Sequence, residues 1–158
     1  MAKIRKFKPK DTRNIAKLIK STFLRYNRNE GGKKSVERYV SRYSLGGLGE
    51  LADRLKDDSI LYVAEEGHKL IGVIRGDEHR VFQLFVDGKF HGKGVGRMLM
   101  GRFEREARKK GSRYININSS LYATRFYQRL GYGKTTGIRS SAKRFGDIKY
   151  QPMRKELK

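Results

Sequence analysis

The sequence contains no cysteine, and its three histidines are scattered at His68, His79 and His91. The absence of cysteine excludes a disulfide scaffold, a thiolate metal site and a cysteine nucleophile. Scattered histidines argue against a histidine metal site, so we expect no metal. No apolar run approaches the roughly 20 residues of a membrane span. The basic segment 1–10 is not followed by the apolar stretch of a secretory signal. These absences favour a cytoplasmic protein with no membrane partner.

Acidic residues are also scarce, since 38 Lys and Arg stand against 16 Asp and Glu and give a formal net charge of +22. This excess favours polyanionic partners such as a phosphorylated cofactor, a nucleic acid or an anionic membrane surface. A basic surface that is merely solvated would give the same total. Hydrophobic residues make up 37% of the chain, which at this length favours one folded domain over residues 1–158.

The first part of the chain alternates helical patterns with loops. Residues 4–7 have strand character, and Pro9 ends that strand. Asp11 is placed to cap one helix and Ser35 to cap a second. A short third helix is expected over residues 48–55. The apolar positions of the first two helices have helical spacing and are Ile15, Leu18, Ile19, Phe23, Val36, Tyr39, Val40 and Tyr43.

The pattern then changes to three strand segments, at residues 60–64, 70–74 and 81–86. Strands separated by short turns in this way predict an antiparallel meander. A long helical pattern begins at Val95 and stops at Gly111. The remaining segments predict a strand, a helix and two weaker strands, over residues 114–117, 121–130, 132–138 and 148–153. The whole pattern indicates an α+β domain.

Gly92, Gly94 and Gly96 alternate directly between the third strand and the long helix. Glycine lets the backbone turn tightly and approach a ligand closely. The first N–H groups of a helix lack internal partners and lie at the positive end of its dipole, where a phosphate binds well. Lys89, Lys93 and Arg97 add positive charge around the same turn. An ordinary tight turn would contain similar glycines, so the loop alone leaves both interpretations open.

Two other phosphate-binding loops do not fit this chain. The dinucleotide fingerprint needs G-x-G-x-x-G at the start of a βαβ unit, whereas this loop is G-x-G-x-G after a β-meander. Residues 133–135, GKT, match the end of a P-loop. A P-loop also needs a glycine at the position of Gln128 and a strand before the loop, whereas here a helix precedes it. We therefore assign neither loop type.

The glycine loop and a second segment together resemble the signatures of the GNAT N-acetyltransferases. Residues 84–97, LFVDGKFHGKGVGR, resemble the acyl-CoA motif, which runs strand, Q/R-x-x-G-x-G/A, helix. Residues 118–132, NSSLYATRFYQRLGY, are similar to the second signature, a small polar residue, Ala, an apolar–Tyr pair, a basic residue and a Gly–aromatic pair. Residues 4–19 are similar to the opening of the family. His91 departs from the Gln or Arg that is usual in the first motif.

The resemblance implies a fold and a co-substrate. The fold would be an α/β/α sandwich, with a mixed and mostly antiparallel sheet, helices on both faces, and a splayed strand pair at the acyl-CoA site. The co-substrate would be acetyl-CoA, its pantetheine arm pairing with the backbone of Phe85 and Val86. Ser120 would lie beside it, where many members have Asn. The backbone amides that would hold the pyrophosphate are those of His91, Gly92, Lys93, Gly94, Val95 and Gly96, with Arg97 nearby.

The resemblance also implies direct attack of a primary amine on the thioester. The amine must be neutral, the oxyanion must be stabilised, and the CoA thiolate must be protonated as it leaves. Tyr127 would be the general acid, since a phenol with a pKa of about 10 can protonate a departing thiolate. A core aromatic is the alternative for Tyr127. A backbone N–H of Phe85 or Val86 would stabilise the oxyanion.

For the general base, the resemblance points to Glu78, which lies near the entry to the third strand. The adjacent Asp77 and His79 are alternatives. All three residue types equally suit a solvated turn. An acceptor that arrives already neutral would need no dedicated base.

The acceptor would meet the first two helices and the loop between them, which is polar and basic. A polycationic acceptor would be repelled by the overall field, although Glu30, Glu37 and Glu50 could form a local acidic pocket. Two functions follow. One is an enzyme that acetylates a small-molecule or peptide amine. The other is a nucleic-acid-directed protein, as an acetyltransferase for RNA-linked amines or as an RNA-binding module. A homodimer is compatible with either.

Overall fold

A central sheet with helices on both faces makes up the computed structural model, which describes all 158 residues. The helices are α1 (Thr12–Tyr26), α2 (Lys33–Ser41), α3 (Leu48–Asp57), α4 (Val95–Lys109) and α5 (Thr124–Arg129). The strands are β1 (Lys3–Lys6), β2 (Ile60–Glu66), β3 (Lys69–Asp77), β4 (Arg80–Val86), β5 (Tyr114–Ser119), β6 (Gly133–Lys134), β7 (Arg139–Ser140) and β8 (Lys149–Glu156). None of the helices combines the length and the apolar character that crossing a membrane requires.

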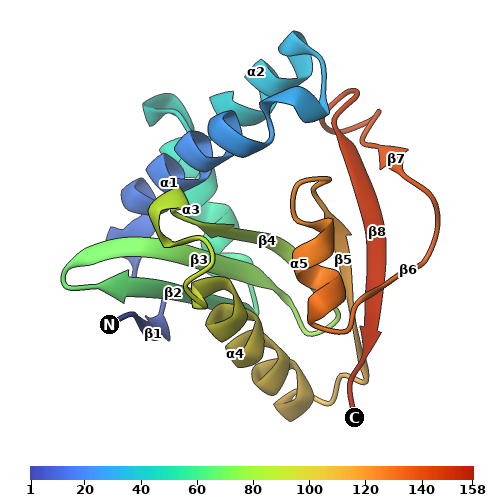
Figure 1. Ribbon diagram of the computed structural model, residues 1–158. Coiled ribbons are helices and arrows are strands. Elements are labelled where there is room, and N and C mark those ends of the chain that lie inside the picture. The colour runs from blue at the N-terminus through green and yellow to red at the C-terminus, as the bar shows by residue number, and fades with distance from the viewer.

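The sheet order is β1-β2-β3-β4-β5-β8-β6, with β7 paired to β8 (Figure 1). The strands from β1 to β4 form the predicted antiparallel meander. Side chains alternate between the two faces of a strand, so Tyr62 and Ala64 pack with α4 while Val63 packs with α1 and α3. Two apolar clusters therefore lie on opposite faces of one sheet, which confirms the α/β/α sandwich.

The sheet opens between β4 and β5. These strands are parallel and pair only at Arg80 with Asn116 and at Val81 with Ile117. Beyond Val81, residues 82–86 of β4 have no partner strand on this side. The predicted splayed strand pair is thus confirmed, and Figure 1 shows β4 and β5 diverging toward α1 and α2.

The C-terminal part of the sheet is built on one long strand. β8 pairs with β5 over six residues and also holds the two-residue strands β6 and β7. The sequence predicted two weak strands here, because polar residues dilute the apolar alternation of β8. Buried Gln151 and Met153 alternate with half-buried Tyr150 and Pro152 and with exposed Arg154. Hydrogen bonding to neighbouring strands on both sides stabilises β8, although its own composition favours a strand only weakly.

Two predicted helix caps are corrected by the structure. Asp11 occupies the N-cap position of α1, but its side chain makes no capping bond. Its carboxylate instead accepts bidentate bonds from Arg5 at 2.9 Å and a bond from the Lys8 N–H at 2.8 Å. The N-cap of α2 is Gly32, not Ser35. The Ser35 hydroxyl accepts a bond from the Asp147 N–H, so it ties α2 to the segment before β8.

Candidate functional site

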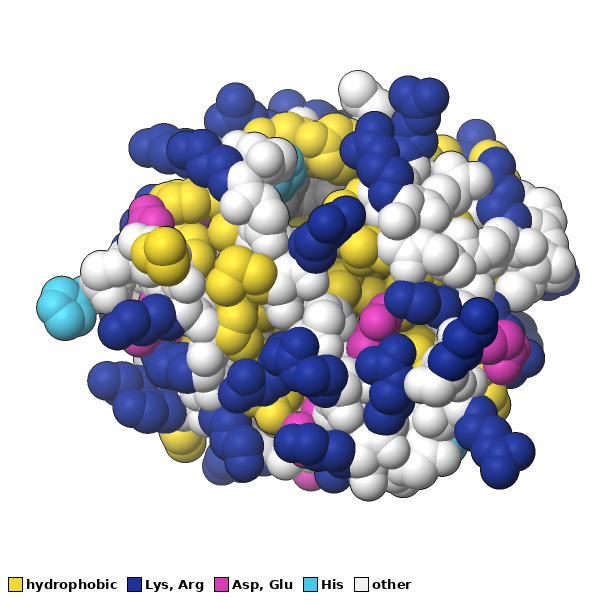
Figure 2. Space-filling view, turned by 60° about the horizontal axis from the view of Figure 1, so that its bottom comes forward, with side chains coloured by type: hydrophobic (Ala, Val, Ile, Leu, Met, Phe, Trp, Pro, Cys, Tyr) yellow, Lys and Arg dark blue, Asp and Glu magenta, His cyan; other side chains and the backbone are white.

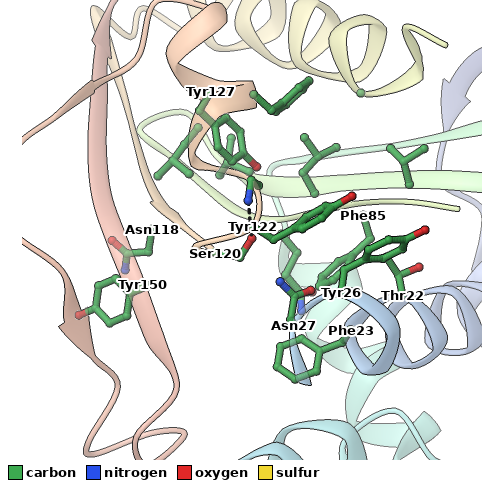
Figure 3. A pocket seen from close by; sticks show the side chains of 18 of the residues that line it. Thr22, Phe23, Tyr26, Asn27, Phe85, Asn118, Ser120, Tyr122, Tyr127 and Tyr150 are labelled. Atoms are coloured by element: carbon green, nitrogen blue, oxygen red, sulfur yellow. Dashed lines mark hydrogen bonds between the residues drawn. The ribbon is translucent and has the colours of Figure 1, made fainter. Parts of the chain in front are cut away.

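A cavity of about 1030 Å³ lies where β4 and β5 diverge. Its walls come from the end of α1, from β4 and the glycine loop, from β5 and α5, and from the segment before β8. In Figure 3, Tyr127 from α5, Phe85 from β4 and Tyr26 from α1 lie around the same space. Figure 2 shows a hollowed face with exposed apolar side chains among many Lys and Arg. The cavity is large enough for an extended ligand.

The glycine loop leads into the N-terminus of α4 with an unusual backbone. Gly92 and Gly94 have φ of 75° and 85°, a left-handed conformation that glycine adopts without strain. Gly94 is the N-cap of α4 and has no capping side chain. The N–H groups of residues 92 and 94–97 donate no hydrogen bond within the protein. These five donors form a cradle at the positive end of the helix dipole, where the sequence analysis predicts a phosphate.

Two of the backbone amides predicted to hold the pyrophosphate already have partners within the protein. The His91 N–H donates to the Gly88 carbonyl and the Lys93 N–H to the Phe90 carbonyl, both at 3.3 Å. The Lys93 side chain does not line the cavity and lies over the Phe90 ring at 5.5 Å. Neither of these amides is free for a ligand, because the turn before the helix already uses them.

The His91 side chain fastens the loop to the end of β4. Its Nε2 donates to the Val86 carbonyl at 2.7 Å, which leaves Nδ1 to accept from the Tyr122 hydroxyl at 3.3 Å. The ring also lies 4.7 Å from the ring of Tyr26. This residue departs from the usual motif, and its side chain has an internal partner at each ring nitrogen. Its contribution is to position the loop.

The β3–β4 register decides which backbone groups of β4 face the cavity. The Asp87 N–H donates to the Ile71 carbonyl at 2.8 Å, and Val73 lies opposite Phe85. Hydrogen-bonded and non-bonded pairs alternate along an antiparallel ladder. The backbone of Phe85 therefore faces β3, and the backbones of Leu84 and Val86 face the gap. Of the two residues predicted to pair with a ligand through their backbone, only Val86 is oriented for it.

Tyr127 projects from α5 into the cavity (Figure 3). Its side chain is buried, and its hydroxyl has no hydrogen-bond partner in the protein. Only one side-chain atom in the chain is both fully buried and unpaired, and it belongs to another residue. The Tyr127 hydroxyl is thus open to the cavity. Burial raises the pKa of this phenol well above its ordinary value, so it is a neutral donor across the physiological range.

Ser120 lines the cavity below Tyr127 and shapes the turn that begins α5. Its hydroxyl accepts from the Ala123 N–H at 3.2 Å, which Figure 3 draws as a dashed line. The predicted place beside the ligand is therefore consistent with its position in the cavity wall. The hydroxyl can still donate its own proton toward the cavity.

Glu30 holds the two sides of the cavity together, a role that sequence reasoning missed. The residue is buried, and its carboxylate accepts from the Asn27 side chain at 3.0 Å, the Leu121 N–H at 2.9 Å and the Tyr122 N–H at 3.0 Å. These bonds join the loop after α1 to the turn before α5. Because the partners on that turn lie more than 90 residues away in sequence, no local pattern signals them.

Residues 29–157 match the family model of the acetyltransferase (GNAT) domain. The chain belongs to the GNAT acetyltransferase family. The resemblance drawn from residues 84–97 and 118–132 is thus confirmed, and the family assigns the chain to the acyltransferases that act with CoA.

Solved structures show the same fold at low sequence identity. A GCN5-related N-acetyltransferase from Rhodopseudomonas palustris has a TM-score of 0.88 at 18% identity, over 99% of this chain and 96% of that one. The PaiA N-acetyltransferase from Thermoplasma acidophilum, in complex with coenzyme A, has a TM-score of 0.78 at 18% identity and 99% coverage of both chains. The aminoglycoside 6'-N-acetyltransferase from Enterococcus faecium has a TM-score of 0.70 at 16% identity, over 98% and 96%.

The structure does not bring Glu78 to the cavity of this GNAT protein. Glu78 lies in the turn before β4, at the opposite end of that strand from the glycine loop, and does not line the cavity. Its carboxylate accepts from the Ser59 hydroxyl at 3.3 Å, and a backbone hydrogen bond lowers its pKa. Asp77 and His79 lie in the same turn, where His79 contacts Ser112 at 2.9 Å. A role as base has no geometric support for any of the three.

The predicted acidic pocket is wrong. Glu37 and Glu50 are exposed and lie outside the cavity lining, and Glu30 is the single carboxylate in it, with its oxygens already bonded. Basic side chains outnumber acidic ones in the cavity lining. Arginines on α3, β3 and α5, and one directly after α2, all lie in its walls. The basic residues of the lining are Arg42, Arg54, Arg75, Arg80, Arg97, Arg125, Arg129, Arg144 and Lys149. The cavity of this GNAT protein is therefore strongly electropositive along its whole length.

Proposed function

We propose that the protein transfers the acetyl group of acetyl-CoA to a primary amine by direct attack, in the cavity between β4 and β5. One observation carries the proposal. The five unpartnered N–H groups at the start of α4, the unpaired edge of β4 and the free Tyr127 hydroxyl all line one cavity. A diphosphate has only acceptor oxygens, and this cradle offers only donors.

Each part of the cavity then has a role. The amides of Gly92, Gly94 and residues 95–97 hold the pyrophosphate, with the Arg97 side chain nearby. The pantetheine arm pairs with the free edge of β4. The N–H of Val86 or Leu84 is oriented toward the gap and can stabilise the oxyanion of the tetrahedral intermediate.

Tyr127 is the proposed general acid. The neutral phenol donates a hydrogen bond to the sulfur and transfers its proton as the thiolate leaves. The attacking amine loses a proton in the same reaction, and that proton restores the phenol through solvent. The protonation balance therefore needs no second acid.

The proposal does not include a dedicated base. The two candidates in the cavity wall are Glu30 and His91, and both are held by internal hydrogen bonds. The surrounding arginines disfavour a cationic amine and so lower the pKa of a bound acceptor. The neutral amine that attack requires is stabilised by the field of the cavity itself.

Release of CoA thiol tests this function directly. The protein contains no cysteine, so a thiol-reactive dye reports only the CoA that is released. The purified protein is incubated with acetyl-CoA and a panel of amines, peptides and aminoacyl-RNA. We expect amine-dependent thiol release, with the acetylated amine identified by mass spectrometry. Release at the same rate without any amine, or none at all across the panel, would reject acetyl transfer to these acceptors.

A further inference from the structure

The inference concerns the acceptor, and it rests on the proposed function. The glycine loop, Arg97 and the arginines of α5 account for charge at the CoA end of the cavity. A second group of basic residues lies at the other end, beside α2, α3 and the start of β4. We call Arg42, Arg54 and Arg75 the arginine cluster. A CoA molecule with its pyrophosphate at the glycine loop does not account for positive charge at this other end of the cavity.

Arg54 is the unusual member of the arginine cluster. Its Nη2 is the single fully buried side-chain nitrogen or oxygen in the chain that has no hydrogen-bond partner. Burial lowers the pKa of the guanidinium, and the charges of Arg42 and Arg75 lower it further. The exposed carboxylate of Glu50 opposes this effect weakly. Buried polar groups are nearly always paired in folded proteins, so this atom is missing an acceptor.

Arg75 donates a hydrogen bond from each of its three guanidinium nitrogens, and its bond to Gln83 fixes which way the Gln83 amide points. It donates to both Asp58 oxygens, at 2.6 and 2.9 Å, and its Nη1 donates to the Gln83 oxygen at 3.1 Å. The Gln83 amide nitrogen then donates to the hydroxyls of Tyr39 at 2.9 Å and Tyr43 at 2.6 Å. Both hydroxyls are acceptors here. One of their protons can bridge the pair, and the other remains to be donated into the cavity.

Aromatic rings form the surface next to these donors. The Phe145 ring lies 5.1 Å from the Tyr39 ring in an edge-to-face arrangement, and the Arg42 guanidinium lies 5.0 Å over Phe145. Tyr39 also stacks on Phe23 at 4.1 Å. This end of the cavity therefore combines an apolar aromatic floor with guanidinium groups, which can only donate, and with two hydroxyls that already accept from Gln83.

We propose that the acceptor is an amine that also carries an anionic group, a carboxylate or a phosphate, bound by Arg54 and the hydroxyl of Tyr43. Such a group has only acceptor oxygens. The Arg54 guanidinium lines the cavity and makes no hydrogen bond or ion pair within the protein, so its less buried N–H groups can donate to these oxygens. The body of the acceptor packs on the rings of Tyr39 and Phe145. Polycationic amines are poor acceptors, because the arginine cluster and the rest of the cavity lining repel them.

A set of matched amines tests the proposal. Tyramine, tyrosine and tyramine O-phosphate share one ring and differ in their anionic group, and spermidine represents the polycations. We expect kcat/KM for tyrosine or tyramine O-phosphate to exceed that for tyramine at least tenfold. Which of the two is higher distinguishes a carboxylate site from a phosphate site. A preference for tyramine or spermidine would overturn the proposal.

The variant Arg54→Gln distinguishes a specific effect of the arginine cluster from an effect of the protein's net positive charge. We expect it to bring the ratio of anionic to neutral kcat/KM close to one, whereas the matched control Arg38→Gln, on the exposed face of α2, keeps the ratio. The Tm of Arg54→Gln should not fall, because the removed charge is unpaired and repelled by its neighbours. An unchanged ratio in Arg54→Gln would refute the role of the cluster.

A binding measurement tests the anion site without requiring that the protein acetylate anything. Tyrosine and tyramine O-phosphate are titrated calorimetrically, one at a time, into the protein with CoA present, and no turnover is needed. Binding that weakens at least tenfold in Arg54→Gln supports the anion site, even if none of the amines is acetylated. If neither compound binds the wild type while CoA still binds, the anion site is overturned and the CoA site stands.

Discussion

Tyr127 is the residue on which the proposed chemistry depends most. Its phenol is buried, open to the cavity at its hydroxyl, and has no internal partner. Tyr132 is a natural comparison on the same segment. It is also buried, but its hydroxyl donates to Glu104 at 3.1 Å and does not line the cavity.

The variant Tyr127→Phe should lower kcat by about 100-fold, the range expected for loss of a general acid. CoA affinity should change little, because the ring is retained. Thiol release and calorimetric titration measure the two quantities. The control Tyr132→Phe should keep kcat and lose about 1 kcal/mol of stability with its hydrogen bond. Equal kcat in Tyr127→Phe and the wild type would remove Tyr127 from the mechanism.

The pH dependence of kcat/KM follows from the same residue. Burial raises the pKa of Tyr127, so its active, protonated form is present below that raised pKa and persists past pH 10. The acceptor amine must be neutral, and an unperturbed alkyl amine has a pKa of about 10.4. We expect kcat/KM to rise with pH through the neutral range and to show no fall near pH 10. A bell-shaped profile with its acid limb near pH 4–5 would indicate a carboxylate base instead.

For single residues, the sequence predicts backbone features better than side-chain partners. The alternation of glycines between a strand and a helix predicts a tight turn at Gly92 and Gly94, and both adopt a left-handed φ that glycine allows without strain. The unpaired nitrogen of Arg54 and the orientation of Gln83 depend on contacts between α2, α3 and the sheet. Such contacts leave no local pattern, so the arginine cluster and the hydroxyls beside it emerge only from the structure.

Among the elements, the loop after α1 and the turn before α5 form one unit through Glu30. Three N–H donors converge on its carboxylate. The turn that it holds leads directly into α5, which carries Tyr127. The position of the general acid is therefore coupled to the loop on the acceptor side of the cavity.

The variant Glu30→Gln should destabilise the protein by about 2–3 kcal/mol, since it removes charge-assisted bonds and turns one acceptor oxygen into a donor. It should also lower kcat severalfold, because α5 is less firmly placed. Denaturant unfolding and thiol release measure these effects. The control Glu37→Gln, exposed on α2, should stay within about 0.5 kcal/mol of the wild type. A Glu30→Gln variant as stable as this control would show that the bonds are not essential.

Some helices and strands lie where the sequence predicts them, and others differ in their bounds. The meander and α4 follow from strong apolar periodicity, and the structure places them at the expected residues. The helix predicted over residues 121–130 begins at Thr124, because the preceding residues form the turn held by Ser120 and Glu30. The strand β8 was underestimated, since pairing with β5, β6 and β7 stabilises it more than its own composition does.

Across the whole molecule, the net charge of +22 works against the compact state through self-repulsion. Added salt screens this repulsion, with a Debye length of about 10 Å at 0.1 M. We expect the Tm to rise by a few degrees between about 50 and 500 mM NaCl, measured by scanning calorimetry. A falling Tm would mean that the seven ion pairs of the structure outweigh the repulsion.

The charge also has a local use at the cavity, where nine basic side chains face one carboxylate. This arrangement suits an anionic co-substrate and, in our proposal, an anionic acceptor. A nucleic-acid partner stays a prediction from total charge.

The proposed function requires that the glycine loop bind CoA through its backbone, and calorimetric titration of CoA into two glycine variants tests this requirement. Gly94 and Gly67 both have positive φ, and at both positions a Cβ would have no other atom within 4 Å. The variants Gly94→Val and Gly67→Val therefore carry similar backbone strain, but only Gly94 lies in the cavity wall. We predict that the wild type and Gly67→Val bind CoA alike and that Gly94→Val binds at least tenfold more weakly. Equal affinity in all three proteins would show that the loop does not hold CoA.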